Sequence, residues 1–222
     1  MALFDELEFR LANPEDIDAI MAFTNSVFIA QAPVSKKVGL SAEDSELLYR
    51  PTVVESLRTP FSLLVFHRPS GDLIAYRIMS LWRRGDAQKT PASGFEIPDR
   101  LRLLGGVLVD LKKSFWDLCP NEVNAVLRRE FSCVRKDFQR RGIASRMLDE
   151  LLDEEELKAS GIDGVMSETS SLANQALLAK KGFTALRDVS YASVIDSEGR
   201  MAIGAKCHDG STKIVLNFKL FK

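Results

Sequence analysis

The chain has 222 residues, 45% of them hydrophobic and 27% charged, which is the composition of a globular protein able to bury a core without disulfide or metal staples. Its formal net charge of −1 shows no excess of basic residues, so we expect neither nucleic acid nor a membrane as its partner. The three cysteines form no CxxC pair and there are only two histidines, so we expect no metal site and a reducing compartment.

The N-terminal residues have neither the basic nor the apolar stretch of a secretory signal. No apolar run reaches the roughly 18 residues needed to span a bilayer, so we expect a cytoplasmic protein. Hydrophobic spacing in the first half predicts two strands joined as a hairpin, flanked by helices. The predicted elements are a strand over 8–11, a helix from Pro14 to about Phe28, an irregular segment over 30–41, a helix over 43–57 that Pro51 interrupts, and hairpin strands over 61–67 and 73–81.

The second half predicts helices alternating with strands. The predicted elements are a helix over 99–118, a strand over 122–134, a long amphipathic helix over 143–158, a strand over 164–169, a helix over 173–181, and strands over 189–195 and 213–221. There is no internal repeat or long linker, so we expect residues 1–222 to form a single mixed α/β domain with one sheet.

The segment over 131–146 carries the clearest chemical signal. A strand is predicted to end near Val134, and a helix to start at Gly142 or Ile143, where free backbone N–H groups bind anions. Five cationic side chains stand here against the single acid Asp137, a balance that favours phosphate binding. The alternative is an ordinary solvated loop with basic surface residues, and from charge and glycine alone the two interpretations are balanced.

Two motifs in this region resemble those of a known family. The residues Gln139, Arg140, Arg141, Gly142, Ile143 and Ala144 match the Q/R-x-x-G-x-G/A signature of the GNAT acetyltransferases. Residues 174–183, which end in Lys-Lys-Gly-Phe, are similar to the family's second motif. The two motifs span about 128–183, and the layout of the whole chain resembles the arylalkylamine (dopamine-type) N-acetyltransferases of invertebrates. The resemblance implies a GNAT fold: a mixed, mostly antiparallel sheet, splayed between its fourth and fifth strands, with helices on both faces.

The resemblance also implies an enzyme that moves acetyl from acetyl-CoA to a primary amine, in particular a small arylalkylamine. The alternatives are another amine acceptor, such as a polyamine, an amino acid or a protein, and a GNAT-fold protein that binds acyl-CoA without catalysis. It further implies that the strand end binds the pantetheine arm and that the loop N–H groups bind the pyrophosphate. The implied coenzyme residues are Cys133, Val134, Gln139, Arg140, Arg141, Gly142, Ile143, Ala144 and Asn174.

The proton-transfer residues depart from the family pattern. Leu178 stands where many members have a tyrosine acid, and Ala32 stands where the invertebrate enzymes have a glutamate base. That subfamily uses serines after the fifth strand, of which Ser170 or Ser171 matches one, while Asn174 stands at the other position. Ser170 is therefore a candidate proton donor, with a helix-capping turn residue as the alternative. Glu168, near the end of a strand, is a candidate base, and its alternative is a solvated carboxylate.

We also expect the helix over 99–118 and the loop over 30–41 to wall an acceptor pocket. The aromatic residues Phe28, Phe95, Phe115 and Trp116 either line that pocket or belong to the core.

Overall fold

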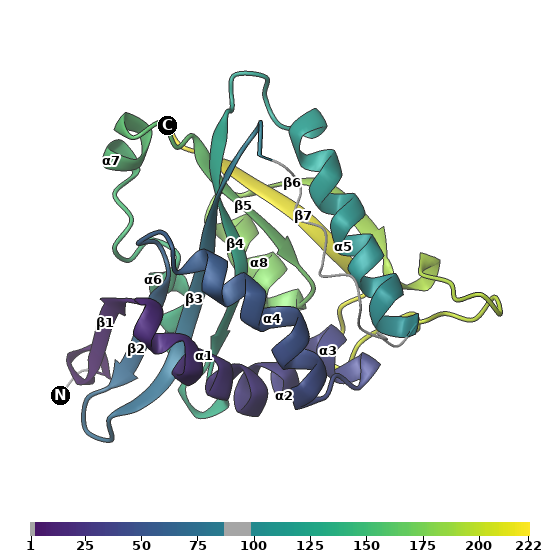
Figure 1. Ribbon diagram of the computed structural model, residues 1–222, viewed down its shortest axis with the longest axis horizontal. Helices are drawn as coiled ribbons and strands as arrows, with labels where there is room; N and C mark the ends of the chain where they lie inside the picture. Colours follow the sequence, from purple (N-terminus) through teal and green to yellow (C-terminus); the bar gives the residue numbers. More distant parts are fainter. Residues whose placement is uncertain (1–2, 87–98) are drawn as a thin grey trace. The chain divides into compact units, whose positions relative to one another are not determined.

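The computed structural model describes residues 3–86 and 99–222. Its seven strands form one sheet in the order β1-β2-β3-β4-β5-β7-β6 (Figure 1). The pairs β1–β2, β2–β3, β5–β7 and β6–β7 are antiparallel, whereas β4 and β5 are parallel. The strands are β1 (Leu7–Leu11), β2 (Leu63–His67), β3 (Asp72–Arg83), β4 (Ala125–Val134), β5 (Gly164–Thr169), β6 (Thr184–Ser190) and β7 (Lys213–Leu220). The predicted mixed α/β class is therefore confirmed.

Along the described part of the chain, the α-helices all lie between β1 and β7. They are α1 (Ile17–Phe23), α2 (Ile29–Gln31), α3 (Pro33–Val38), α4 (Ala42–Ser56), α5 (Asp99–Leu118), α6 (Ile143–Met147), α7 (Glu154–Ala159) and α8 (Leu172–Lys180). Shorter turns are η1 (Leu3–Glu6), η2 (Pro14–Asp16), the π-helical η3 (Thr24–Phe28), η4 (Lys136–Phe138) and η5 (Tyr191–Ser193).

The chain divides into two compact units, and β3 and β4 each contribute residues to both. The first unit comprises Met1–Gln31, Ser41–Trp82 and Leu127–Ile162, and the second comprises Ala32–Leu40, Arg83–Val126 and Asp163–Lys222. The expectation of a single domain stays a prediction.

The first unit buries apolar side chains on both faces of its strands, because successive residues of a strand point to opposite sides. Leu64 of β2 packs in a cluster with Ile20 of α1 and Val53 of α4, and all three are fully buried. Its neighbours Leu63 and Val65 pack in a second cluster. That cluster also contains Val134, Phe138, Ile143 and Met147, which fix the end of β4 and the start of α6.

The second unit is built on β7, which pairs with β5 on one side and β6 on the other. Gly164 starts β5 at a very close approach: a Cβ there would lie 2.3 Å from the Lys219 carbonyl oxygen. Phe115 of α5 packs edge-on against Phe218 of β7, with ring centroids 5.3 Å apart. Phe115 is fully buried, so this contact belongs to the core of the unit.

The long helix predicted over 143–158 is wrong, because the chain forms two short helices there. After α6, Arg77 of β3 donates hydrogen bonds to the carbonyl oxygens of Met147 and Glu150, and Leu151 takes a left-handed φ of 54°. Asp153 then caps α7 by accepting hydrogen bonds from two backbone N–H groups. A buried arginine distant in sequence thus ends the first helix, and a local cap starts the second.

Three further boundaries differ from the predictions. The segment over 30–41 is not irregular: Pro33 starts α3, and Gly39, with a left-handed φ of 66°, ends it. Pro51 does not interrupt α4, whose Val53 is fully buried in the core. The strand predicted over 189–195 is displaced: β6 ends at Ser190, and the fully buried Tyr191 begins a 3-10 turn.

Candidate functional site

The loop over residues 135–142, named the coenzyme loop below after the role expected of it, joins β4 to α6. Phe138 within the loop and Ile143 directly after it are buried and anchor the loop in the core of the first unit. Arg140 and Gly142 both have a left-handed backbone, with φ of 62° and 85°. Left-handed residues placed close together turn neighbouring N–H groups toward one concave side, which is an anion-binding geometry. The loop signature therefore corresponds to a local backbone shape that can hold a phosphate.

The backbone donors of this loop fit such a ligand. Within the described part of the chain, the N–H groups of Arg140–Ala144 donate to no other group, and Gly142 provides no side-chain cap for α6. The dipole of α6 adds less than expected, because this helix has only five residues. The concave loop backbone, rather than the helix, is the main feature that can bind an anion.

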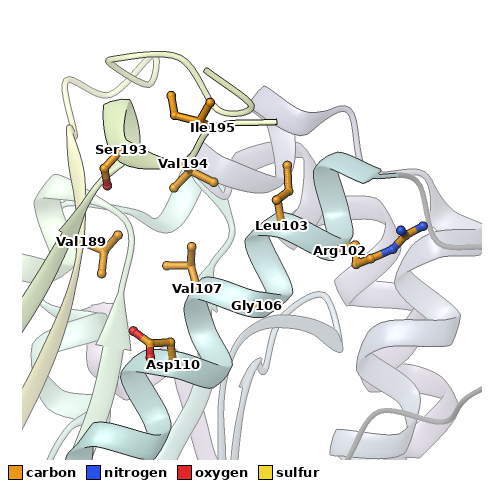
Figure 2. A pocket seen from close by; sticks show the side chains of 9 residues that line it. All are labelled: Arg102, Leu103, Gly106, Val107, Asp110, Val189, Ser193, Val194 and Ile195. Carbon is orange, nitrogen blue, oxygen red and sulfur yellow. The ribbon is translucent and has the colours of Figure 1, made fainter. Parts of the chain in front are cut away.

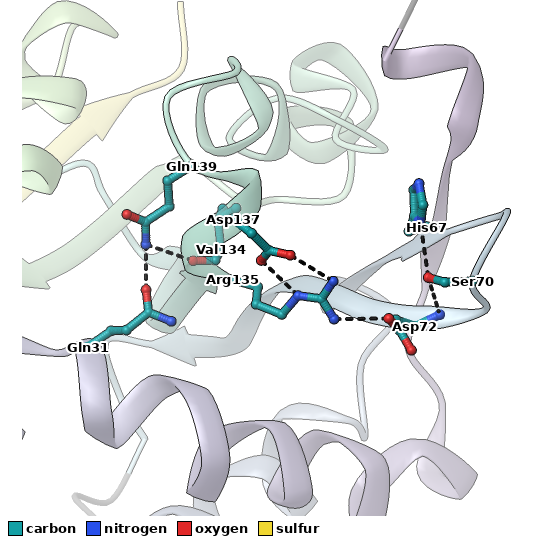
Figure 3. Close-up of polar contacts among 8 residues, drawn as sticks. All are labelled: Gln31, His67, Ser70, Asp72, Val134, Arg135, Asp137 and Gln139. Atoms are coloured by element: carbon teal, nitrogen blue, oxygen red, sulfur yellow. Dashed lines mark hydrogen bonds and ion pairs between the residues drawn. The ribbon is translucent and has the colours of Figure 1, made fainter.

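The charge of the loop is smaller than the sequence predicts. Arg135 makes ion pairs with Asp72 at 3.1 Å and Asp137 at 2.9 Å (Figure 3), and Arg146 pairs with Glu150 at 2.6 Å. The hydrogen bond from Arg135 holds the pKa of Asp137 below its usual value, so the only acid of the loop stays ionised and paired. The cations Lys136, Arg140 and Arg141 make no ion pair among residues 3–86 and 99–222, so they can face a phosphate.

Gln139 ties the loop to the end of β4. Its side-chain Nε2 donates to the Val134 carbonyl oxygen at 2.9 Å and to Oε1 of Gln31 at 2.5 Å (Figure 3). The amide of Gln31 therefore lies beside the loop, although 108 positions separate it from Gln139 in the sequence. Sequence reasoning missed this contact because neither periodicity nor spacing connects residues so far apart.

Cys133 lies at the same strand end but has no nucleophilic character. Burial raises the pKa of its thiol to about 12, so the thiol stays protonated at neutral pH. Its side chain packs against the apolar cluster of α1 and α4. The interpretation of Cys133 as a small strand residue, with its backbone as the functional part, agrees with this environment.

The second unit holds the other predicted site residues around the turn between β5 and α8. Ser171, not Ser170, caps α8, because its hydroxyl accepts a hydrogen bond from the Asn174 N–H at 3.2 Å. The Ser170 hydroxyl makes no hydrogen bond in the described part of the chain, so the capping interpretation of Ser170 is wrong. Glu168 is half-buried in β5 opposite Leu216, so its environment is not that of a fully solvated carboxylate.

Leu178 offers no route for a proton. It is fully buried within α8, which ends at Lys180 shortly before Gly182 with its left-handed φ of 82°. The position that many family members give to a tyrosine acid is thus a core position in this chain.

A shallow pocket of about 380 Å³ lies on the second unit, between α5 and residues 189–195 (Figure 2). Its floor is aliphatic, formed mainly by Leu103, Val107 and Val194. Asp110 at its edge pairs with Arg187 at 2.7 Å. The helix over 99–118 lines this pocket, but the loop over 30–41 does not, and among the described residues the lining has aliphatic and polar residues and no aromatic one. The acceptor pocket walled by that helix and that loop stays a prediction.

The aromatic residues expected around an acceptor lie elsewhere. Phe28 packs edge-on against Tyr49 and at a tilt against Phe131, at centroid distances of 5.5 and 5.7 Å, in the first unit. Phe115 packs on Trp116 and Phe218 in the core of the second unit. Phe95 lies outside the described residues.

Among the described residues, no helix is both long and apolar enough to cross a bilayer.

Comparison with known proteins finds matches in structure but none in sequence. No family model matches the chain, and no curated protein matches its sequence. Arylalkylamine N-acetyltransferase 2 from Aedes aegypti matches in structure with a TM-score of 0.76 at 14% identity, covering 97% of this chain and 99% of that one. The C-terminal condensation domain of Ebony, in complex with beta-alanyl-dopamine, matches with a TM-score of 0.73 at 13% identity, covering 96% and 98%.

A third structure belongs to a different substrate class. The polyamine N-acetyltransferase of Drosophila melanogaster, which catalyses the formation of N-acetylagmatine, has a TM-score of 0.67 at 11% identity and covers 96% of this chain and 99% of that one. At such identities the likeness establishes the fold. The chain has the fold of the GNAT N-acetyltransferases.

Proposed function

We propose that this protein is an N-acetyltransferase that uses acetyl-CoA to acetylate a primary amine. The observation that carries the proposal is the loop over 135–142, whose left-handed Arg140 and Gly142 free five consecutive N–H groups at the position of the GNAT signature. These N–H groups and the cations Lys136, Arg140 and Arg141 would hold the pyrophosphate of the coenzyme.

The remaining coenzyme residues act through their backbone and side-chain amides. The backbone of Cys133 and Val134 would pair with the pantetheine arm, and the Val134 N–H would polarise the thioester carbonyl. The hydrogen bond from Gln139 to the Val134 carbonyl holds this strand end in place. Asn174 would lie beside the pantetheine.

The acceptor we propose is a small arylalkylamine. The fold is shared with an arylalkylamine N-acetyltransferase and with a domain that holds beta-alanyl-dopamine, and these neighbours support the assignment. A polyamine is the alternative, supported by the polyamine enzyme of the same fold.

Attack on the thioester requires a neutral amine. An alkyl ammonium with a pKa near 10.4 is only ~0.04% neutral at pH 7. Ala32 has no ionisable group, and the amide of Gln31 accepts no proton at neutral pH. Glu168 is a candidate base, and Glu168→Gln tests it: if this variant removes a plateau of rate near neutral pH, Glu168 is the base.

A release assay decides between catalysis and binding. Free CoA is measured with acetyl-CoA and a panel of arylalkylamines, polyamines and amino acids, each against hydrolysis without amine. We expect at least one arylalkylamine to release CoA well above hydrolysis. The second candidate function, an acyl-CoA-binding protein without turnover, is favoured by the buried Leu178 and by Ala32. Firm CoA binding with no turnover on any amine would establish that second function.

A further inference from the structure

The turn between β5 and α8, residues 169–172, is fixed by side chains on both sides. Gln175 donates its side-chain N–H to the Thr169 carbonyl at 3.2 Å, and Tyr191 donates its phenol to the Ser170 carbonyl at 2.6 Å. Asp209 accepts the Leu172 N–H at 2.9 Å. The backbone on either side of Ser170 is therefore held in place.

Tyr191 is suited to a fixed donor role. It is fully buried, and its own N–H donates to the Thr212 carbonyl at 2.9 Å. Burial raises the pKa of its phenol well above the usual value, so the group keeps its proton at neutral pH. The phenol therefore acts as a permanent hydrogen-bond donor to the Ser170 carbonyl.

Asp209 completes the arrangement from the segment before β7. One carboxylate oxygen accepts the Ser211 hydroxyl at 2.6 Å and the Ser211 N–H at 3.0 Å, while the other accepts the Leu172 N–H. The Ser211 hydroxyl oxygen lies 3.5 Å from the Tyr191 phenol oxygen. The two contacts on the turn thus belong to one connected polar cluster.

Ser170 is the residue whose backbone this cluster holds. Its side chain is half-buried, and its hydroxyl is not used by the cap of α8, which Ser171 supplies. We propose that Tyr191, together with Asp209, is a positioning residue that holds the backbone at Ser170, and with it the position of the Ser170 hydroxyl, for acyl transfer. This inference rests on the proposed function.

The Ser170 hydroxyl held in this position would transfer a proton to the leaving group. The amine nitrogen bonds to the acyl carbon, the C–S bond breaks, and the Ser170 hydroxyl gives its proton to the departing thiolate. The proton that the amine loses restores the hydroxyl, so amine and acetyl-CoA yield amide and CoA. Leu178 is buried and apolar, so it cannot donate that proton.

The test compares Tyr191→Phe, Ser170→Ala, their combination, and Ser62→Ala in steady-state kinetics. Ser62 is a matched control, because it is a fully buried hydroxyl that donates to a backbone carbonyl, that of Met79, and has no place in the site. We expect Tyr191→Phe to lower kcat by up to about 100-fold, since small displacements of reacting groups have effects of that size. The KM for acetyl-CoA should change by no more than about twofold, and the control should keep its kcat, because neither substitution alters the coenzyme loop.

The double variant supplies the decisive readout. If Tyr191 acts only through Ser170, Tyr191→Phe should have no further effect on kcat in the Ser170→Ala background. An unchanged kcat in Tyr191→Phe, an unchanged kcat in Ser170→Ala, or an additive loss in the double variant overturns the positioning role while leaving the proposed function intact. A wild-type protein that turns over no amine overturns the proposed function itself, and the positioning role with it.

Discussion

Replacement of Gly142 by aspartate tests the coenzyme loop directly. Gly142 has a φ of 85°, and a Cβ there would lie 3.6 Å from the ring of Phe4, an ordinary contact distance. The structural cost is therefore mainly the left-handed backbone, about 1–2 kcal/mol. With an unfolding entropy of about 2.1 cal/mol/K per residue, a chain of this length should lose about 2–4 °C in Tm.

The effect on binding should be larger and separable. CoA at about 100 times its Kd stabilises a protein by about 2.7 kcal/mol, which corresponds to a rise of about 6 °C for this chain. Gly142→Asp places a carboxylate beside the N–H groups that we assign to the pyrophosphate, so charge repulsion should abolish that rise. Thermal melting with and without CoA measures both effects in one experiment.

Gly161→Asp is the matched control, because Gly161 has a φ of 74° and nothing lies within 4 Å of its Cβ position. This variant should lose a similar Tm yet keep the full shift with CoA. A normal shift in Gly142→Asp would refute the pyrophosphate assignment. Equal loss of the shift in both variants would show that backbone strain, rather than the loop, controls binding.

Three further predictions follow from individual side chains. Arg77→Met should lower the free energy of unfolding, measured by urea titration, by about 2–4 kcal/mol, because the guanidinium donates hydrogen bonds to three carbonyls. The cost of burying the guanidinium offsets part of the stability that these hydrogen bonds contribute. A decrease in unfolding free energy below about 0.5 kcal/mol would contradict this prediction. If no base is present, the wild-type rate should rise about tenfold per pH unit up to the pKa of the amine. Gln31→Glu should then raise the rate near pH 7 and flatten that slope, whereas a wild-type plateau near neutrality would indicate a base elsewhere. The hydrogen bond from Arg10 lowers the pKa of Asp16, so its contribution is present at neutral pH and is lost as pH falls through the folded pKa. Asp16→Asn should be less stable at pH 7 and lose less stability on acidification, and parallel acid profiles would argue against this origin.

The sequence by itself determined the features that depend on neighbouring residues. Glycine suits position 142 because its φ is positive, and the strand before it and the buried Ile143 after it are visible as local patterns. The short run over 164–169 and the helical spacing over 99–118 were likewise predicted as a strand and a helix with the bounds of β5 and α5. A signature that depends on local backbone shape can be read from the chain without its tertiary structure.

Only the tertiary structure shows which contacts between distant segments end these elements or hold them in place. Arg77 ends α6 from 70 positions away, Gln31 reaches Gln139 from 108 positions away, and Tyr191 holds the carbonyl of Ser170. Each of these contacts is a hydrogen bond between residues that share no period, so their spacing in the sequence carries no signal. The assignment of Ser170 and Ser171 shows the same limit: both serines can cap a helix, and only the position of the Asn174 N–H selects Ser171.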